Sequence, residues 1–307
     1  MDRTTARSAF LAAPLTALLL SGCGLSNGGQ SSAGSGHILV AAAESFWGSI
    51  ATQLGGSHVT VTSIIVNPAT DPHAYEPTPQ DSRTMAQSQY VVVNGAGYDA
   101  WAPKLVDANP SSSRRVLTVA DLAGRREGDN PHMWYSPPTV MRVIDRVTSD
   151  YKALDPADAA YFDEQAGSFR SIALQHYNTV RAAIRSRYGG VAVGATESIF
   201  VDLASDLGLH LVTPPDYMKA ISEGNDPSAG DKSAFDSQVA NRQVRVLAFN
   251  RQNSTPDIQA LVDKARAEAI PVVAITETLD PPTATFQDWQ SAQLDSLQAA
   301  LAQATGR

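Results

Sequence analysis

Ile38-Leu39-Val40-Ala41-Ala42-Ala43 is a run of six apolar residues, and its length indicates a strand buried on both faces of a sheet. A helix-like stretch follows at residues 46–54. Further strand patterns in the first half of the chain occur at residues 59–64, 90–94 and 115–119. Strands that alternate with helices are typical of a parallel sheet with helices on both faces. Residues 37–154 are therefore predicted to form an N-terminal α/β lobe.

The second half of the chain repeats this alternation. Its strand patterns lie at residues 191–194, 210–212, 244–249 and 271–275. Residues 189–307 are therefore predicted to form a C-terminal α/β lobe, so that the fold consists of two small parallel-sheet lobes. Since ligands of such sheets bind at the carboxyl ends of the strands, we expect the functional site in the cleft between the lobes.

One long helix is predicted to connect the two lobes, at residues 155–188. Asp155 can cap its first turn, Pro156 suits that turn, and Gly189 ends it. Its apolar residues recur at steps of three and four, the spacing of one buried stripe: Phe162, Ala166, Phe169, Ala173, Tyr177, Val180 and Ile184. A continuous helix of this length would span roughly 50 Å. We expect it to limit the hinge between the lobes.

The N-terminus has the features of a bacterial lipoprotein signal at residues 1–22. Arg3 and Arg7 precede an apolar run at residues 10–20, which is too short to span a bilayer stably. Cys23, the only cysteine of the chain, follows at the position where such signals are acylated, and a Gly/Ser-rich tether occupies residues 23–36. The mature protein is expected to be extracytoplasmic, anchored to the cell membrane by lipid on Cys23 and free of disulfides.

The formal net charge of the 307-residue chain is −8. An acidic body of this kind is a poor nucleic-acid binder and attracts cations. No nucleic-acid partner is expected, and the chain is expected to be a monomer.

Two histidines occupy near-duplicate surroundings. The stretches Asp71-Pro72-His73-Ala74-Tyr75-Glu76-Pro77 and Asp129-Asn130-Pro131-His132-Met133-Trp134 each place a histidine directly after a proline. Proline fixes its own φ and pushes its predecessor to extended geometry, so both imidazoles are predicted on stiff loops. Imidazole is the commonest neutral metal ligand. His73 and His132 are therefore candidate metal ligands.

Acidic residues follow two buried strands of the second half. Glu197 comes after the strand at 191–194, and Glu277 comes after the strand at 271–275. Asp280, three residues beyond Glu277 and followed by two prolines, is the alternative to Glu277. With the two histidines these residues make a set of four candidate ligands drawn from both lobes.

The paired histidine motifs resemble those of the zinc/manganese/iron ABC-transporter solute-binding lipoproteins, the ZnuA/TroA-like group. The resemblance extends over essentially the whole mature chain and includes residues 94–101, 196–200 and 275–278. It implies a two-lobed receptor that binds one divalent transition metal ion (Mn, Zn or Fe) and delivers it to a metal ABC permease and its ATPase. It also implies His73 and His132 as first and second ligands, Glu197 as third, and Glu277 as fourth, where the family usually has an aspartate.

The sequence departs from the zinc-specific members of that family. The histidine- and acid-rich loop that many of them carry between the first two ligand motifs is missing, and Glu197 stands where they often have histidine. Two carboxylates favour a harder, more oxygen-rich shell, of the kind manganese and iron accept.

Two other functions are alternatives to the receptor. A metal-dependent hydrolase would keep an open coordination position beside a general base, but the sequence has no His-Glu-x-x-His helix, and Glu76 is the only nearby candidate base. A surface adhesin-type lipoprotein is compatible with the anchor, although no residue requires that role.

Overall fold

The structure is a computed structural model that describes residues 37–70 and 72–307 of the chain. These residues belong to one compact unit. The predicted signal, Cys23 and the tether lie outside the described residues.

The first sheet has four parallel strands in the order β2-β1-β3-β4. Its strands are β1 (Ile38–Glu44), β2 (Val59–Ile65), β3 (Tyr90–Val93) and β4 (Arg115–Thr118). Successive residues of β1 point to opposite faces, so that Val40 and Ala42 join one apolar cluster while Ala41 and Ala43 join another. The sheet is thus buried on both sides, as the apolar runs predicted.

The second sheet repeats this topology in the order β6-β5-β7-β8, again with parallel pairing throughout. Its strands are β5 (Ala192–Ala195), β6 (His210–Leu211), β7 (Val246–Asn250) and β8 (Val272–Ile275). In both sheets the chain runs from a central strand outward to one edge, then returns to the other side of that central strand. Such a change of direction opens a crevice at the carboxyl ends of the two central strands.

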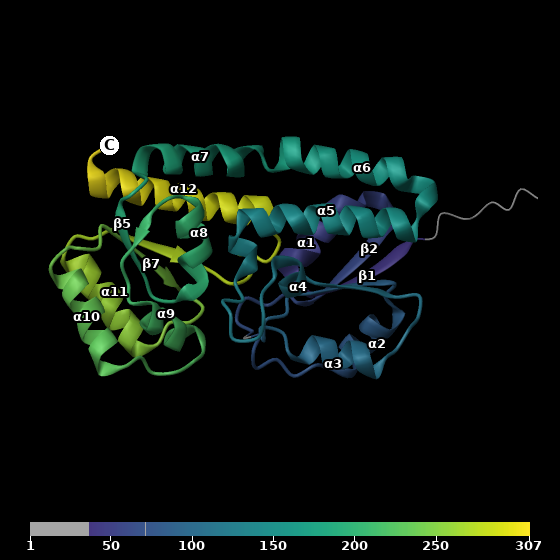
Figure 1. The fold of residues 1–307 in the computed structure, drawn as a ribbon, viewed down its shortest axis with the longest axis horizontal. Helices are drawn as coiled ribbons and strands as arrows, with labels where there is room; N and C mark the ends of the chain where they lie inside the picture. Colours follow the sequence, from purple (N-terminus) through teal and green to yellow (C-terminus); the bar gives the residue numbers. More distant parts are fainter. Residues whose placement is uncertain (1–36, 71) are drawn as a thin grey trace, which may run out of the picture. The chain divides into compact units, whose positions relative to one another are not determined.

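Twelve α-helices of the described residues cover and connect the sheets (Figure 1). Their bounds are α1 (Ser45–Gly55), α2 (Pro79–Gln87), α3 (Trp101–Ala108), α4 (Val119–Ala123), α5 (Pro137–Leu154), α6 (Ala159–Ser168), α7 (Gln175–Tyr188), α8 (Val201–Asp206), α9 (Pro215–Ser222), α10 (Ala229–Ala240), α11 (Pro256–Ala267) and α12 (Phe286–Thr305). Short 3-10 segments lie at η1 (Gly56–His58), η2 (Met133–Tyr135), η3 (Pro156–Asp158) and η5 (Ser198–Phe200). No helix of the described residues is both long and apolar enough to cross a membrane.

The connection between the lobes is helical along most of its length but is not the continuous α-helix that the sequence predicted. It consists of α6, a π-helical turn η4 (Phe169–Ala173) and α7, with Leu174 between the last two (Figure 1). The apolar spacing predicted that Ala173 is buried. In the structure Ala173 is only partly buried, and Leu174 is the buried residue, with 1% of its surface exposed. Leu174 lies five positions after Phe169, and the Leu174 N–H donates to the Phe169 carbonyl at 2.9 Å. The wider turn therefore brings the larger side chain into the core.

The predicted start of this helix is also wrong in one respect. Asp155 precedes η3 and makes no side-chain capping hydrogen bond. Its carboxylate instead lies near the side chains of His58 and Asp158.

One apolar cluster contains buried residues of both lobes and of the connecting helices. The C-terminal helix α12 contributes to the contact between the lobes, because Trp289 lies 6.4 Å from Phe46 of α1 between ring centroids, in a stacked arrangement. The Phe286 N–H also donates to Ser49 Oγ at 2.9 Å.

Candidate metal site

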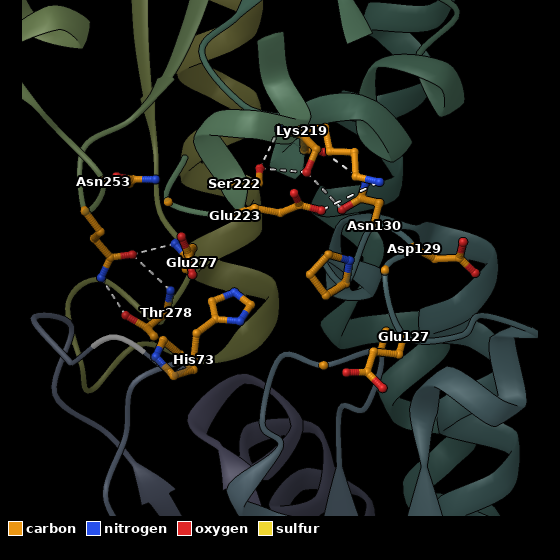
Figure 2. Close-up of a pocket in the computed structure, with 18 of the residues that line it drawn as sticks. His73, Glu127, Asp129, Asn130, Lys219, Ser222, Glu223, Asn253, Glu277 and Thr278 are labelled. Atoms are coloured by element: carbon orange, nitrogen blue, oxygen red, sulfur yellow. Dashed lines mark hydrogen bonds and ion pairs between the residues drawn. The ribbon is translucent and has the colours of Figure 1, made fainter. Parts of the chain in front are cut away.

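A cavity of about 650 Å³ lies at the carboxyl ends of the strands of both sheets. His73 and Asn130 come to its wall from the first lobe, and Ser198, Asn253 and Glu277 come from the second (Figure 2). Ser198, Asn253 and Glu277 lie within three residues of the carboxyl ends of β5, β7 and β8. Ligand-binding residues of parallel sheets are expected at these ends.

His73 lies on the loop after β2 and is exposed. Its ring lies edge-on to Tyr98, with 4.9 Å between the ring centroids. Tyr98 also lies 6.1 Å from the ring of His132, again edge-on. The two candidate histidines are therefore brought to the same tyrosine, although 58 residues separate them in the chain.

The loop that carries Tyr98 is held in a tight conformation. Gly95, Ala96 and Gly97 all have positive φ values, of 80°, 56° and 83°. Glycine adopts such values without a steric penalty, whereas Ala96 pays roughly 1 kcal/mol or more. The Asp99 carboxylate accepts the backbone N–H groups of Asn94 and Gly95, each at 2.7 Å, and so stabilises this strained turn.

His132 is 2% exposed and sits behind the wall of the cavity. Its Nδ1 lies 2.7 Å from Asn130 Oδ1. An amide oxygen is an acceptor only, so Nδ1 carries the hydrogen and Nε2 keeps the lone pair that a metal needs. Burial, with a smaller contribution from the charge of His73, lowers the pKa of His132 to about 3. Its imidazole is thus neutral and orientated before any ligand arrives.

Glu197 is 1% exposed and follows β5. Asn253 Nδ2 donates to Glu197 Oε2 at 2.9 Å, but Glu197 Oε1 is buried with no hydrogen-bond partner among the described residues. Burial, and then the charge of Glu277, raises the pKa of Glu197 to about 8. A buried carboxylate oxygen without a donor is costly, and a cation is the partner that would satisfy it.

Glu277 follows β8 and receives a hydrogen bond from each lobe. Tyr98 Oη donates to its Oε2 at 3.0 Å, and Asn250 Nδ2 donates to its Oε1 at 2.7 Å. Burial and the charge of Glu277 hold the pKa of Tyr98 well above its usual value, so this phenol remains a donor.

Asp280 does not line this cavity. It pairs with Arg251 and borders a separate depression beside α12. Glu277, and not Asp280, therefore shares the wall of this cavity with His73, and its charge interacts with that of Glu197. Glu76 is exposed and is absent from the cavity lining.

Several polar residues around the candidate ligands were not predicted from the sequence. Asn130 orientates His132, Asn253 holds Glu197, and Asn250 and Tyr98 hold Glu277. The position of Asn250 could have been predicted from the sequence, because it stands at the end of a buried strand, where a polar side chain reaches the same edge of the sheet as Glu197. Asn253 carried no such signal, since it lies in the loop beyond β7.

The chain also connects the two lobes across the cleft. Asn130 Nδ2 donates to the Ser198 carbonyl at 2.9 Å, and Arg125 forms a two-pronged ion pair with Asp202 at 2.7 Å. These contacts join the two lobes beside the cavity.

Comparison of the chain with known proteins and protein families gives matches to metal-uptake and metal-binding proteins. The sequence model described as "Zinc-uptake complex component A periplasmic" matches residues 40–300. The manganese-binding lipoprotein MntA of Bacillus subtilis is 22% identical over 271 residues, which cover 85% of this chain and 86% of that protein. MntA of Halalkalibacterium halodurans is 28% identical over 156 residues, so the match spans only about half of each chain, 50% and 51%.

Among solved structures, a periplasmic metal binding protein from Candidatus Liberibacter asiaticus has the same fold. Its TM-score is 0.70 at 19% identity, covering 86% of this chain and 99% of that one. The two-lobed α/β architecture predicted from the sequence is thus confirmed. With the family model covering most of its length, the chain belongs to the ZnuA family of periplasmic zinc-uptake components.

Proposed function

We propose that this protein is the extracytoplasmic solute-binding lipoprotein of a metal ABC importer, which captures one divalent transition metal ion and delivers it to the permease. The observation that carries this proposal is Glu197 Oε1, a buried carboxylate oxygen with no donor among the described residues, on a side chain whose charge interacts with that of Glu277 in the cavity wall. Membership of the family supports the receptor function and does not favour the hydrolase.

The proposed ligands are His73, His132, Glu197 and Glu277. Two neutral imidazoles and two carboxylates carry a net charge of −2, which cancels the charge of a divalent ion. Asn130 accepts a hydrogen bond from His132, Tyr98 and Asn250 donate to Glu277, and Asn253 donates to Glu197. Such outer contacts orientate metal ligands and tune metal affinity.

Each ligand is tested by alanine substitution, with binding measured by calorimetry on metal-free protein. His73→Ala is the sharpest variant, because His73 is exposed and its loss leaves the core intact. We expect its affinity to fall by orders of magnitude with an unchanged circular dichroism spectrum. Asp280→Ala is the matched control, since Asp280 pairs with Arg251 outside the cavity. Loss of binding in Asp280→Ala but not in Glu277→Ala would contradict the assignment of the fourth ligand.

The transported metal is proposed to be manganese or iron rather than zinc alone. Two carboxylates can each offer a second oxygen, which raises the coordination number above the four that zinc prefers. The family model is named for zinc uptake, whereas the two MntA relatives are named for manganese. Since affinity rises from manganese to zinc for almost any such site, binding strength alone does not identify the cargo.

Uptake is the decisive experiment. The gene is deleted, and cellular manganese, iron and zinc are measured under limitation of each metal. We expect manganese or iron to fall and the wild-type gene to restore it. A strain in which only zinc falls would refute the preference and leave the receptor function standing.

The membrane partners follow from the same proposal. A monomer anchored through lipid on Cys23 would present its cleft to the permease and its ATPase. One acyl chain alone anchors only weakly, so diacylation of Cys23 is expected. Cys23→Ser should release the protein from the membrane fraction on cell fractionation, and a variant that stays membrane-bound would show that another anchor operates.

A further inference from the structure

A second group of ligand-type side chains lies away from the cleft, at the amino ends of the strands in the first lobe. His58, which ends η1 just before β2, meets Asp155 and Asp158 from the turn between α5 and α6. Each of the three offers a ligating atom, and these atoms all lie within 4.8 Å of one another. The α5–α6 turn can be followed in Figure 1 at the end of this lobe farther from the second sheet.

Asp155 is the member of this group whose buried position is not accounted for by an ion pair. His58 Nδ1 and Asp158 Oδ2 lie 2.9 Å apart and already form a pair. Asp155 is 8% exposed, and its Oδ2 is buried with no hydrogen-bond partner in the described part of the chain. Asp155 does not cap η3 either, so its Oδ2 remains without a donor beside the other two side chains.

The lysine nearest to Asp155 along the described chain does not pair with it. Lys152, one turn earlier on α5, is paired with Asp163 at 2.6 Å. A buried carboxylate without a donor or a cation is costly to the folded state. An ion from solution would supply the missing charge.

The surroundings hold the His58 ring in place. Its centroid lies 4.1 Å from that of Tyr161 and 5.9 Å from that of Phe162. Tyr161 Oη in turn accepts the Ser57 N–H at 3.0 Å, which fixes the residue before His58. The imidazole is thus positioned by packing rather than free to rotate into solvent.

We propose that His58, Asp155 and Asp158 form a second binding site for a divalent transition metal ion of the zinc type, separate from the cleft. One imidazole and two carboxylates balance the charge of such an ion, and water completes the coordination as it does in three-ligand zinc sites. On binding, the metal takes the place of the hydrogen between His58 Nδ1 and Asp158 Oδ2, and that hydrogen leaves to solvent as a proton. It would tie the start of β2 to the turn that leads into α6, and so fix the first end of the connecting helices.

The experiment counts bound zinc by equilibrium dialysis with elemental analysis, on metal-free wild type and on His58→Ala, Asp155→Asn and Asp158→Asn. We expect each variant to bind one equivalent fewer than wild type. Asp158→Asn guards against misfolding, because Asp158 is partly exposed at the surface. The difference in equivalents does not depend on whether the cleft binds metal, so the proposed function and this site fail separately.

His176→Ala is the matched control. His176 Nε2 pairs with Asp295 Oδ2 at 2.9 Å, the same kind of contact as the His58 pair, but it belongs to no three-ligand group of the described residues. We expect this variant to keep the full stoichiometry. If His58→Ala binds as much zinc as wild type, or if His176→Ala loses the same equivalent, the second site is refuted.

Discussion

Replacing Glu197 with glutamine should stabilise the metal-free protein while it destroys metal binding. Burial and the charge of Glu277 raise the pKa of Glu197 from 4.5 to about 8. The unfolded chain therefore loses this proton near pH 4.5, whereas the folded protein keeps it until about pH 8. Stability that is fully present below pH 4.5 is lost progressively as the pH rises through this window.

The magnitude follows from these two pKa values. At pH 8 the carboxyl costs the folded state on the order of 4 kcal/mol, and at pH 5 about 1 kcal/mol. Glutamine has the same shape and no charge to desolvate, and its carbonyl can still accept from Asn253. The advantage of the variant should therefore be about 3 kcal/mol larger at pH 8 than at pH 5, roughly 6–12 °C in melting temperature.

The assay is thermal unfolding of metal-free wild type and Glu197→Gln at pH 5 and pH 8, followed by metal titration. Glu223→Gln is the matched control, because Glu223 also lines the cavity but is exposed and pairs with Lys219. Its melting temperature should differ little from that of wild type at either pH. If the advantage of Glu197→Gln is the same at both pH values, the buried carboxylate is not the source of the pH dependence.

Four further outcomes are expected. Tyr98→Phe removes the hydrogen bond to Glu277 and should weaken metal binding about 10-fold or more in calorimetry, and unchanged affinity would show that the phenol does not support the ligand. Denaturant unfolding of metal-free wild type should show that the free energy of unfolding falls as the pH is lowered from 6.5 to 4, because His132 is protonated in the unfolded chain but stays neutral when it is buried. His132→Gln should reduce this dependence of stability on pH. Trp134 lies 5.3 Å from His132, so metal should change the tryptophan emission, and Trp134→Phe should abolish that change. Small-angle scattering should register little compaction on metal addition, because contacts across the cleft are already formed, and a large collapse would contradict this.

The sequence predicted the strands well because a fully buried parallel strand requires a continuous apolar run. Residues 38–43 illustrate this, since both faces of β1 are covered. The prolines before His73 and His132 likewise predict loops rather than helices or strands at these positions, because proline restricts the backbone locally. These signals are local, and local patterns are what a single sequence carries.

The parts that were missed depend on distant residues. The π turn at Phe169–Ala173 arises because Leu174 packs into the core, which a spacing of three and four does not reveal. Asn253 meets Glu197 across 56 residues of sequence, and Asn130 selects the histidine nitrogen that stays free. Asp155 has the residue type of a helix cap, but its actual neighbour, His58, lies far back in the chain.

The position of α12 has a consequence for biogenesis. Gln287 exchanges hydrogen bonds with Gln53 of α1 at 2.7 and 3.0 Å, and Phe286 and Trp289 complete the contact with that helix. The last helix of the described residues thus contacts the first one. A nascent chain that has made only its first lobe lacks this contact, so we expect the native packing of α1 to be completed only after α12 has been synthesised. For a polypeptide expected to cross a membrane before it folds, we expect this delay to favour export.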